Sequence, residues 1–346
     1  MSKLTDLDAG ATPQSPATPD AAISRVLDEV AALGQKPIET LSPEEARQQP
    51  LPADGVLSLL RKAGKETPPQ LGVETKDFII PGPAGGIQAR LYGKAESDSV
   101  KPVLVYWHGG GWVIADLDDY DSTPRAMARA ADCIVVSCHY RRAPEHKFPA
   151  AHEDAWAAYQ WVVANAASLG GDPARVAVMG ESAGGNLAAN VSIMARDEGE
   201  QAPLAQILVY PVAGNDMNTV SYIENANAKP LSKPMMEWFV SHVFEDKAQT
   251  ADPRINLVAA NLADLPPTTI IAAEIDPLRT EGQLLARRLD DAGTDIGYHL
   301  WNGATHEFFG MGLIYADAAA AEGVAGLALR KAFGQGIIGK IAQALG

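Results

Sequence analysis

The sequence is poor in cysteine and carries no common metal-binding spacing. Two cysteines occur in 346 residues, Cys133 and Cys138, at the ends of a short apolar run. An odd separation along a strand points side chains to opposite faces, so we expect these thiols to stay unpaired. Buried, reduced thiols are typical of the cytoplasm, which is the location we predict. The absence of CxxC and HExxH spacings predicts a protein without a metal, and no cofactor is expected.

Positive charge and long apolar segments are also scarce. The chain has 28 Lys and Arg residues against 43 Asp and Glu residues, a net charge of −15. This acidity disfavours nucleic acid and anionic membrane surfaces as partners. No apolar run approaches the ~20 residues that a membrane-spanning helix needs. The hydrophobic fraction of 47% is ordinary for a globular protein and, at this length, is enough for a large core.

The first residues lack the apolar region of a signal peptide. Residues 1–20 are rich in Ala, Thr, Pro, Asp and Ser, which predicts a disordered leader. Residues 21–33 have apolar side chains at helical spacing, so we expect an amphipathic helix there. The apolar side of this helix consists of Ile23, Val26, Leu27, Val30 and Leu33.

Strands and helices alternate through the rest of the chain. A hairpin is expected first, with strands at 73–80 and 87–92. Further strands are expected near residues 102–107, 133–139, 176–179, 205–212, 268–275 and 297–302, and the clearest helices at 121–131 and 152–167. This alternation predicts an α/β protein with a mostly parallel, doubly wound sheet and an antiparallel N-terminal hairpin. A helical insertion at 214–250 interrupts this alternation of strands and helices.

The segment Gly180-Glu181-Ser182-Ala183-Gly184 is a G-x-S-x-G motif. In a nucleophile elbow the serine occupies a strained turn between a strand and a helix, and residues two positions away must be small. A short apolar strand precedes the motif and a helical stretch follows it. We therefore favour the elbow over the alternative, an ordinary glycine turn.

A second glycine-rich segment, His108-Gly109-Gly110-Gly111-Trp112, follows the apolar strand at 102–107. Its glycines let the backbone approach a substrate and aim N–H groups at it, as an oxyanion loop does. The alternatives are a flexible turn or a phosphate loop, but no Gly-Lys-Ser/Thr follows. We expect His108 to brace the loop rather than to act as a base.

A nucleophilic serine needs a base, which follows it in the chain in α/β-hydrolases. Three histidines follow Ser182. His242 lies in a helical stretch and His299 inside a strand, where we expect it to be partly buried. His306 lies just beyond that strand, where this fold places catalytic groups, so it is the predicted base.

The orienting acid is predicted to be Asp276. It ends the apolar run 269–275, and Pro277 stops the strand behind it. Asp264 precedes the same strand and falls at the wrong end of the sheet, while Glu274 sits deeper in the strand. Three further carboxylates are interpreted as solvated surface charges of the next helix and its exit, namely Asp290, Asp291 and Asp295.

At this point the chain resembles the bacterial hormone-sensitive-lipase-like esterases, the family IV lipolytic enzymes of the α/β-hydrolase superfamily. The matching segments are HGGGW (108–112), HYRRAPEHKFPAAHED (139–154), GDPARVAVMGESAGGNLA (171–188), DPLRTEG (276–282) and THEFFG (305–310). Five motifs in order make the resemblance specific, and it covers about residues 60 to 340. The sequence departs from the family at Glu181 and Thr280, where Asp is frequent. Neither is a triad position.

The resemblance implies Ser182, Asp276 and His306 as a catalytic triad. It implies the amides of Gly110, Gly111 and Ala183 as the oxyanion hole, with His108, Gly109 and Glu181 in support. Glu181 is interpreted as a support of the elbow and the neighbouring loops, and the alternative is a solvent-facing charge. We expect Trp112, Tyr210 and Phe308 to line the substrate pocket.

The resemblance also implies a domain division and a function. Residues 21–60 and 214–250 are expected to form a helical cap over a catalytic domain of 61–213 and 251–346; the alternative is helical decoration elsewhere. The expected function is a serine carboxylesterase acting on small, short-chain esters, and similar esterases are often homodimers. The same triad serves amidases, carbamate hydrolases and lactonases. A non-catalytic receptor on this fold is disfavoured by the presence of His306, which such receptors lack.

Overall fold

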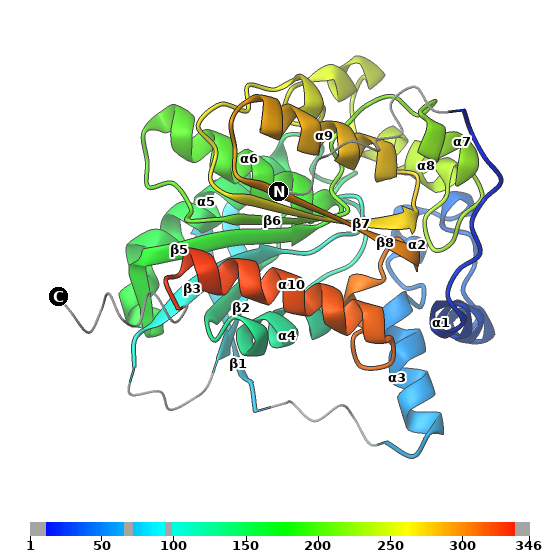
Figure 1. Cartoon of the computed structure of the whole chain (residues 1–346), viewed down its shortest axis with the longest axis horizontal. Helices are drawn as coiled ribbons and strands as arrows, with labels where there is room; N and C mark the ends of the chain where they lie inside the picture. Colours follow the sequence, from blue (N-terminus) through cyan, green and yellow to red (C-terminus); the bar gives the residue numbers. More distant parts are fainter. Residues whose placement is uncertain (1–11, 66–71, 94–98, 336–346) are drawn as a thin grey trace.

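An eight-stranded sheet runs through the centre of the protein (Figure 1). The structure is a computed structural model and describes residues 12–65, 72–93 and 99–335. The predicted leader therefore lies largely outside the described residues. The strands are β1 (Glu74–Gly82), β2 (Gly85–Gly93), β3 (Lys101–Trp107), β4 (Ile134–Cys138), β5 (Gly171–Glu181), β6 (Gln206–Val209), β7 (Thr268–Ile275) and β8 (Ile296–Thr305).

The strands lie in the order β1-β2-β4-β3-β5-β6-β7-β8. The β1–β2 hairpin is antiparallel, β2 is antiparallel to β4, and all other neighbours are parallel. The middle strands are apolar on both faces because helices cover both sides; Val103, Leu104 and Val105 are fully buried. The predicted α/β fold with an antiparallel start is confirmed.

Helices pack on both faces of the sheet (Figure 1). α4 (Ser122–Ala130) and α10 (Ala316–Ala332) contact each other on one face. The opposite face carries α5 (Ala150–Asn165), α6 (Ala183–Glu198) and α9 (Arg279–Asp291). A doubly wound sheet of this kind places its binding crevice at the carboxyl ends of its parallel strands.

Element bounds differ from the prediction where pairing extends a strand beyond its apolar run. β5 begins at Gly171 rather than near residue 176, because Gly171 pairs with Lys101 of β3. β8 continues to Thr305, which pairs with Ile275. The first helix, α1 (Ala21–Ala32), buries Ile23, Val26 and Val30 as predicted, whereas Leu33 follows the helix and is exposed. Cys133 and Cys138 are free and buried.

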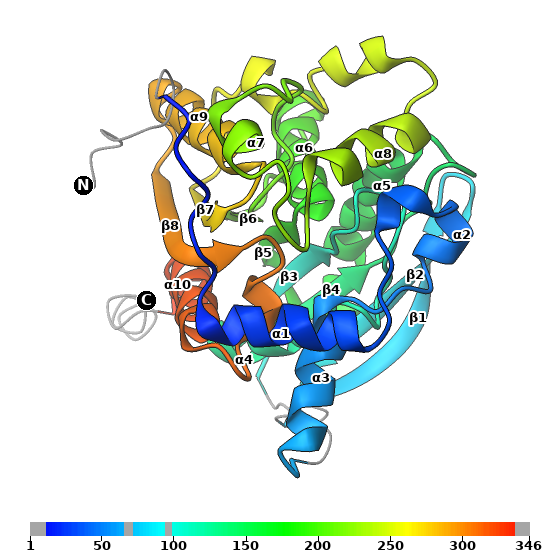
Figure 2. The ribbon, with the colours of Figure 1, turned by 90° about the vertical axis from the view of Figure 1, so that its right-hand side faces the viewer.

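Two helical segments lie at the carboxyl ends of the strands (Figure 2). The N-terminal segment contains α1, α2 (Pro43–Ala46) and α3 (Pro52–Lys62), and the insertion contains α7 (Val220–Glu224) and α8 (Lys233–Val243). The indole N–H of Trp238 in α8 donates to the carbonyl of Leu41, 3.1 Å away, and so joins the two segments. Arg47 joins the N-terminal segment to the sheet domain by donating to the carbonyls of Val113 and Ala143.

Candidate active site

The G-x-S-x-G motif forms the turn between β5 and α6. Ser182 lies between the two elements with φ at 55°, in the left-handed region. A Cβ at Gly180 would lie 2.0 Å from the carbonyl oxygen of Gly184, and a Cβ at Gly184 would lie 2.1 Å from that of Trp107. Because backbone atoms cannot move aside, neither glycine tolerates a side chain.

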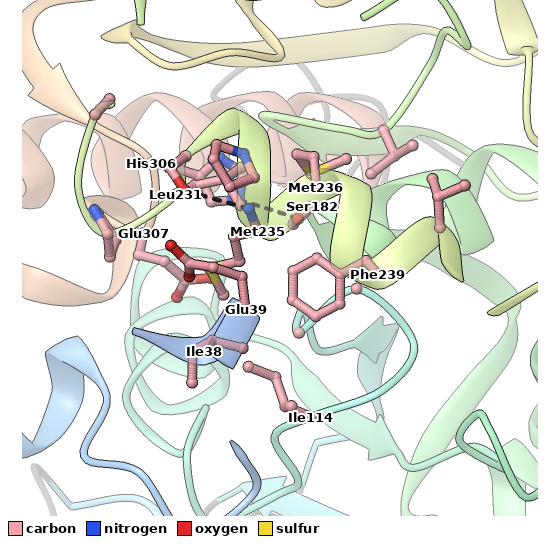
Figure 3. Close-up of a pocket in the computed structure, with 18 of the residues that line it drawn as sticks. Ile38, Glu39, Ile114, Ser182, Leu231, Met235, Met236, Phe239, His306 and Glu307 are labelled. Atoms are coloured by element: carbon pink, nitrogen blue, oxygen red, sulfur yellow. Dashed lines mark hydrogen bonds between the residues drawn. The ribbon is translucent and has the colours of Figure 1, made fainter. Parts of the chain in front are cut away.

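Ser182, His306 and Asp276 form a hydrogen-bonded chain at this turn. His306 follows β8, and its Nε2 lies 3.0 Å from Oγ of Ser182, the contact drawn as a dashed line in Figure 3. Its Nδ1 lies 2.7 Å from Oδ2 of Asp276, which follows β7. A carboxylate accepts only, so Nδ1 carries the proton and Nε2 can accept the serine hydroxyl proton. All three side chains are buried.

Neighbouring groups fix Asp276 and the charge state of the histidine. The amide of Leu278 donates to Oδ1 of Asp276 at 2.8 Å. Burial on its own lowers the pKa of His306. The attraction and hydrogen bond of Asp276, together with smaller attractions from Glu307 and Glu181, outweigh burial, so the pKa of His306 lies above its usual value.

The other candidates for base and acid lie elsewhere. His242 on α8 has its Nδ1 2.8 Å from the carbonyl oxygen of Trp238. His299 lies on β8 as predicted, but its side chain is exposed rather than partly buried, because β8 is an edge strand with a neighbour on one side only. Glu274 accepts from the amide of Gly303 at 2.6 Å.

The glycine loop after β3 lies beside Ser182. Gly110 and Gly111 have φ of 91° and 58°, which favour glycine. A Cβ at Gly110 would lie 2.3 Å from the carbonyl oxygen of Ile114, and a Cβ at Gly111 would lie 2.4 Å from the ring of Phe239. The amides of the two glycines donate to no backbone or side-chain acceptor within the part of the chain that the structure describes.

Ring side chains behind the loop orient its peptide groups. The carbonyl oxygen of Gly109 lies 2.8 Å from Nδ1 of His108 and accepts from the hydroxyl of Tyr140, also at 2.8 Å. A peptide group is planar, so anchoring this carbonyl turns the N–H of Gly110 to the opposite side. Burial holds the pKa of His108 well below its usual value, and a second contribution comes from His139. His108 therefore braces the loop.

Glu181, next to the serine, is buried among aromatic side chains. The hydroxyls of Tyr106 and Tyr210 donate to its carboxylate at 2.6 and 2.5 Å. Burial, together with the charge of Glu307, raises the pKa of Glu181 to about 7. The ring centroid of Tyr210 lies 4.4 Å from that of His306. The alternative of a solvent-facing charge at Glu181 is wrong.

A cavity of about 510 Å³ contains Ser182 and His306 (Figure 3). Gly110, Gly111 and Ile114 of the sheet domain contribute to its lining. Both helical segments contribute walls, which are mainly apolar and include Leu27, Ile38, Leu51, Leu231, Met235, Met236, Phe239, Val240 and Val243. The cavity thus has apolar walls around a polar centre, the usual form of a small-molecule site.

Comparisons with known proteins agree with this geometry. A family model described as alpha/beta hydrolase fold matches residues 104–310, more than half of the chain. The chain is 42% identical over 250 residues to the carboxylic ester hydrolase LipN of Mycobacterium tuberculosis, covering 70% of this chain and 66% of LipN. It is 38% identical over 289 residues to the carboxylesterase NlhH of the same organism, covering 81% of this chain and 90% of NlhH.

The chain belongs to the hormone-sensitive-lipase-like carboxylesterases. Its structure is similar to that of a Pyrobaculum calidifontis esterase, with a TM-score of 0.80 and 34% identity, covering 90% of this chain and 98% of that one. The protein is therefore a carboxylic ester hydrolase with an α/β-hydrolase fold, which implies an ester substrate.

Of the three expected pocket residues of this carboxylesterase, only Trp112 lines the cavity. Tyr210 and Phe308 lie behind the histidine, outside the residues that line it. The backbone of Tyr210 has φ at 34°, and its hydroxyl bonds to Glu181. Phe308 is fully buried against Tyr210 and Trp301. The assignment of Tyr210 and Phe308 to the pocket is wrong, because both side chains pack into the core.

Sequence reasoning missed Glu307 and Tyr120. Both line the cavity, and the hydroxyl of Tyr120 donates to the carboxylate of Glu307. The signal for Glu307 was its place directly after the histidine. Tyr120 lies in a loop with no motif of its own, so only the folded chain connects it with the site.

Metal and membrane features are absent from the described residues. Across 12–65, 72–93 and 99–335, no group of three or more His, Cys, Asp and Glu side chains is placed to hold a metal ion. Within the same ranges, every helix is too short or too polar to cross a bilayer.

Proposed function

We propose that this carboxylesterase hydrolyses short-chain acyl esters through a Ser182–His306–Asp276 triad and an acyl-enzyme intermediate. Oγ of Ser182 attacks the ester carbonyl carbon while Nε2 of His306 accepts its proton. Asp276 holds the imidazole in the required tautomer and stabilises the imidazolium. The proton then passes from His306 to the leaving alcohol oxygen as the C–O bond breaks. Water, deprotonated by His306, releases the acid from the acyl-serine.

The oxyanion of the tetrahedral intermediate is proposed to lie between the amides of Gly110, Gly111 and Ala183. Ala183 begins α6, so its N–H belongs to the positive end of the helix dipole. Each preorganised donor contributes roughly 3 kcal/mol to the stabilisation of the transition state. The single observation that carries the proposal is the continuous Asp276–His306–Ser182 hydrogen-bond chain inside the cavity.

A fluorophosphonate probe tests the proposed nucleophile directly. The probe should form a covalent bond with Ser182, identified by peptide mass spectrometry, and should abolish hydrolysis of p-nitrophenyl butanoate in proportion to labelling. Ser182→Ala should take up no probe. Labelling of another serine, or activity that survives complete labelling of Ser182, contradicts the proposal.

The proposed cap consists of residues 21–60 and 214–250, and it is inferred to limit acyl-chain length. Supporting it, both segments line the cavity, and the ring of Phe239 packs against Gly111. A cavity of about 510 Å³ is within the usual size range of small-molecule sites and has room for a small ester. Amides, carbamates and lactones would react at the same triad, so the preference for simple oxygen esters is part of the proposal.

Phe239→Ala is predicted to shift chain-length preference upwards. Removal of the ring opens space beside the oxyanion loop, so the ratio of kcat/KM for p-nitrophenyl octanoate to that for the butanoate should rise about tenfold or more, the effect of at least one additional buried methylene. Leu327→Ala, on the exposed face of α10, is the control and should leave the ratio unchanged. An unchanged ratio in Phe239→Ala places the acyl chain elsewhere.

Activity is predicted to fall on the acid side as His306 protonates. Only the neutral imidazole accepts the serine proton, and the pKa of His306 is raised above its usual value of about 6.5. A raised pKa means that the histidine holds its proton to a higher pH, so the acid limb of kcat/KM should have its midpoint above about 6.5. A profile that stays flat down to about pH 4 contradicts a histidine base.

Glu181→Gln is predicted to cost about 1–3 kcal/mol of stability and far less activity than loss of Ser182, because one tyrosine hydroxyl loses its acceptor. The folded pKa of about 7 exceeds the unfolded value near 4.5, so the stability from Glu181 is present below pH 4.5 and is lost as the pH rises through 7. The difference in unfolding free energy between wild type and variant should therefore shrink from pH 5 to pH 8. A triad-sized loss of activity contradicts a supporting role.

We also propose that the protein is located in the cytoplasm and forms a homodimer. The buried, free state of Cys133 and Cys138 is compatible with a reducing compartment. Light scattering of the purified full chain measures the oligomeric state.

A further inference from the structure

The carboxyl group of Glu307 lies in the wall of the catalytic cavity beside the histidine. Glu307 follows His306 directly, and Figure 3 draws it with Ile38, Glu39 and Met235 around the same space. Most of the nearby wall is apolar. A carboxyl group at this position is costly unless it is hydrogen-bonded, so its presence calls for a partner.

The backbone and one tyrosine fix this carboxyl group. Glu307 has φ at 66°, a conformation that a residue with a side chain adopts only where its surroundings hold it. The hydroxyl of Tyr120 donates to Oε1 and is the partner of the carboxyl group among the described residues. A carboxylate has about four acceptor positions, so one bond leaves acceptor capacity directed at the cavity.

The proposed chemistry determines on which side of the cavity the leaving alcohol lies. Nε2 of His306 delivers its proton to the leaving oxygen, so the alcohol leaves from the side of the tetrahedral carbon that faces His306. The oxyanion points instead to Gly110 and Gly111. Substituents on the alcohol therefore extend along the wall next to His306, where Glu307 lies.

We infer that Glu307 determines alcohol-side specificity, by accepting a hydrogen bond from a hydroxyl or protonated amine carried by the leaving alcohol. This inference rests on the proposed hydrolysis at Ser182. Burial raises the pKa of Glu307, while His306 and Tyr120 partly oppose the rise, which agrees with a group that gains from a further donor. Sites built to bond a substrate hydroxyl discriminate against analogues that lack it, because the buried acceptor is then left unpaired.

Two pairs of isosteric esters test the inference on the full chain. One pair is 2-hydroxyethyl butanoate and propyl butanoate; the other is 2-(dimethylammonio)ethyl butanoate and 3-methylbutyl butanoate. The kcat/KM ratio of donor ester to alkyl ester should be about tenfold or more in wild type for at least one pair, the effect of one hydrogen bond to a charged group. The pair that shows the preference identifies the donor as hydroxyl or ammonium.

Variants assign that ratio to Glu307. In Glu307→Leu the ratio should fall to about one. Glu307→Gln keeps an acceptor oxygen but no charge, so it should retain part of a hydroxyl preference and lose an ammonium preference. Tyr120→Phe removes the bond that orients the carboxyl group and should lower the ratio less than Glu307→Leu. Glu39→Gln, at an exposed cavity carboxylate, is the matched control.

The inference is overturned if both wild-type ratios are near one. It is also overturned if Glu307→Leu or Glu307→Gln leaves an ammonium preference intact. Finally, it is overturned if Glu39→Gln lowers the ratio as much as Glu307→Leu does. Phosphonate labelling of Ser182 and turnover of propyl butanoate are measured in the same preparations. If wild type shows neither labelling nor turnover, the proposed function is contradicted. If labelling is normal but the kcat/KM ratios of donor to alkyl ester are near one, only the role of Glu307 is contradicted.

Discussion

Ser182→Ala is expected to lower kcat for p-nitrophenyl butanoate by about four orders of magnitude or more while the fold is kept. The substitution removes the hydroxyl oxygen that lies 3.0 Å from Nε2 of His306, and with it the proposed acyl-enzyme. Alanine fits the turn because it is smaller than serine and Ser182 is buried. Thermal unfolding and circular dichroism should match wild type.

His306→Ala should cost about as much as Ser182→Ala, and the double variant should lose little more. Nucleophile and base act as a unit, so removing either abolishes the same step. The effects are measured as kcat at saturating substrate, with a fresh enzyme preparation to exclude contamination. A folded His306→Ala variant that keeps most of its activity means that the base is misassigned, and His299→Ala is then the variant to measure.

The sequence predicted well those elements whose cause is local. The run 268–275 has an apolar, buried centre at 270–273, and β7 has the predicted bounds. The elbow depends on Gly180 and Gly184, each two residues from Ser182. Five consecutive residues are therefore enough to show its steric requirement. The strand–helix alternation likewise arises from patterns shorter than twenty residues. Such local signals were sufficient to place the side chains of the proposed triad at the ends of the correct strands.

The wrong and missing predictions concern contacts between distant residues. Tyr106 and Glu181 are 75 residues apart, and Tyr120 and Glu307 are 187 apart. No pattern near any of these residues indicates its partner. Tyr210 follows β6, in a position that suggests a pocket wall, but its backbone at φ 34° and its bond to Glu181 turn it behind His306. Which way an aromatic side chain points at a strand end depends on tertiary packing.

The oxyanion loop gives a second large expected effect, from Gly110→Ala. The new Cβ would lie 2.3 Å from the carbonyl oxygen of Ile114 and 2.8 Å from its carbon, both backbone atoms. The loop must therefore shift, and with it the proposed oxyanion amides. Loss of one such donor costs about 10²–10³ in kcat. We expect a loss of this size, with KM changed much less because the donors act on the transition state.

Gly111→Ala offers a matched comparison in the same loop. Its Cβ would meet the ring of Phe239 at 2.4 to 2.6 Å, and a side chain can move where a backbone cannot. The left-handed conformation itself costs alanine about 1–2 kcal/mol. Gly111→Ala should therefore lose less activity than Gly110→Ala, about tenfold. Adding Phe239→Ala relieves the steric contact but not the backbone strain, so it should restore part of that loss in Gly111→Ala and none in Gly110→Ala.

This difference in rescue separates the proposed role of the loop from general packing damage. Phosphonate labelling rates and kcat are measured for the two glycine variants and their Phe239→Ala doubles, with Phe239→Ala alone as reference. If Gly110 supplies an oxyanion donor, its variant loses both turnover and labelling, since the phosphonate adduct uses the same amides. The Gly110 amide is not an oxyanion donor if a folded Gly110→Ala variant keeps full kcat. The same conclusion follows if Phe239→Ala restores the activity of both glycine variants equally.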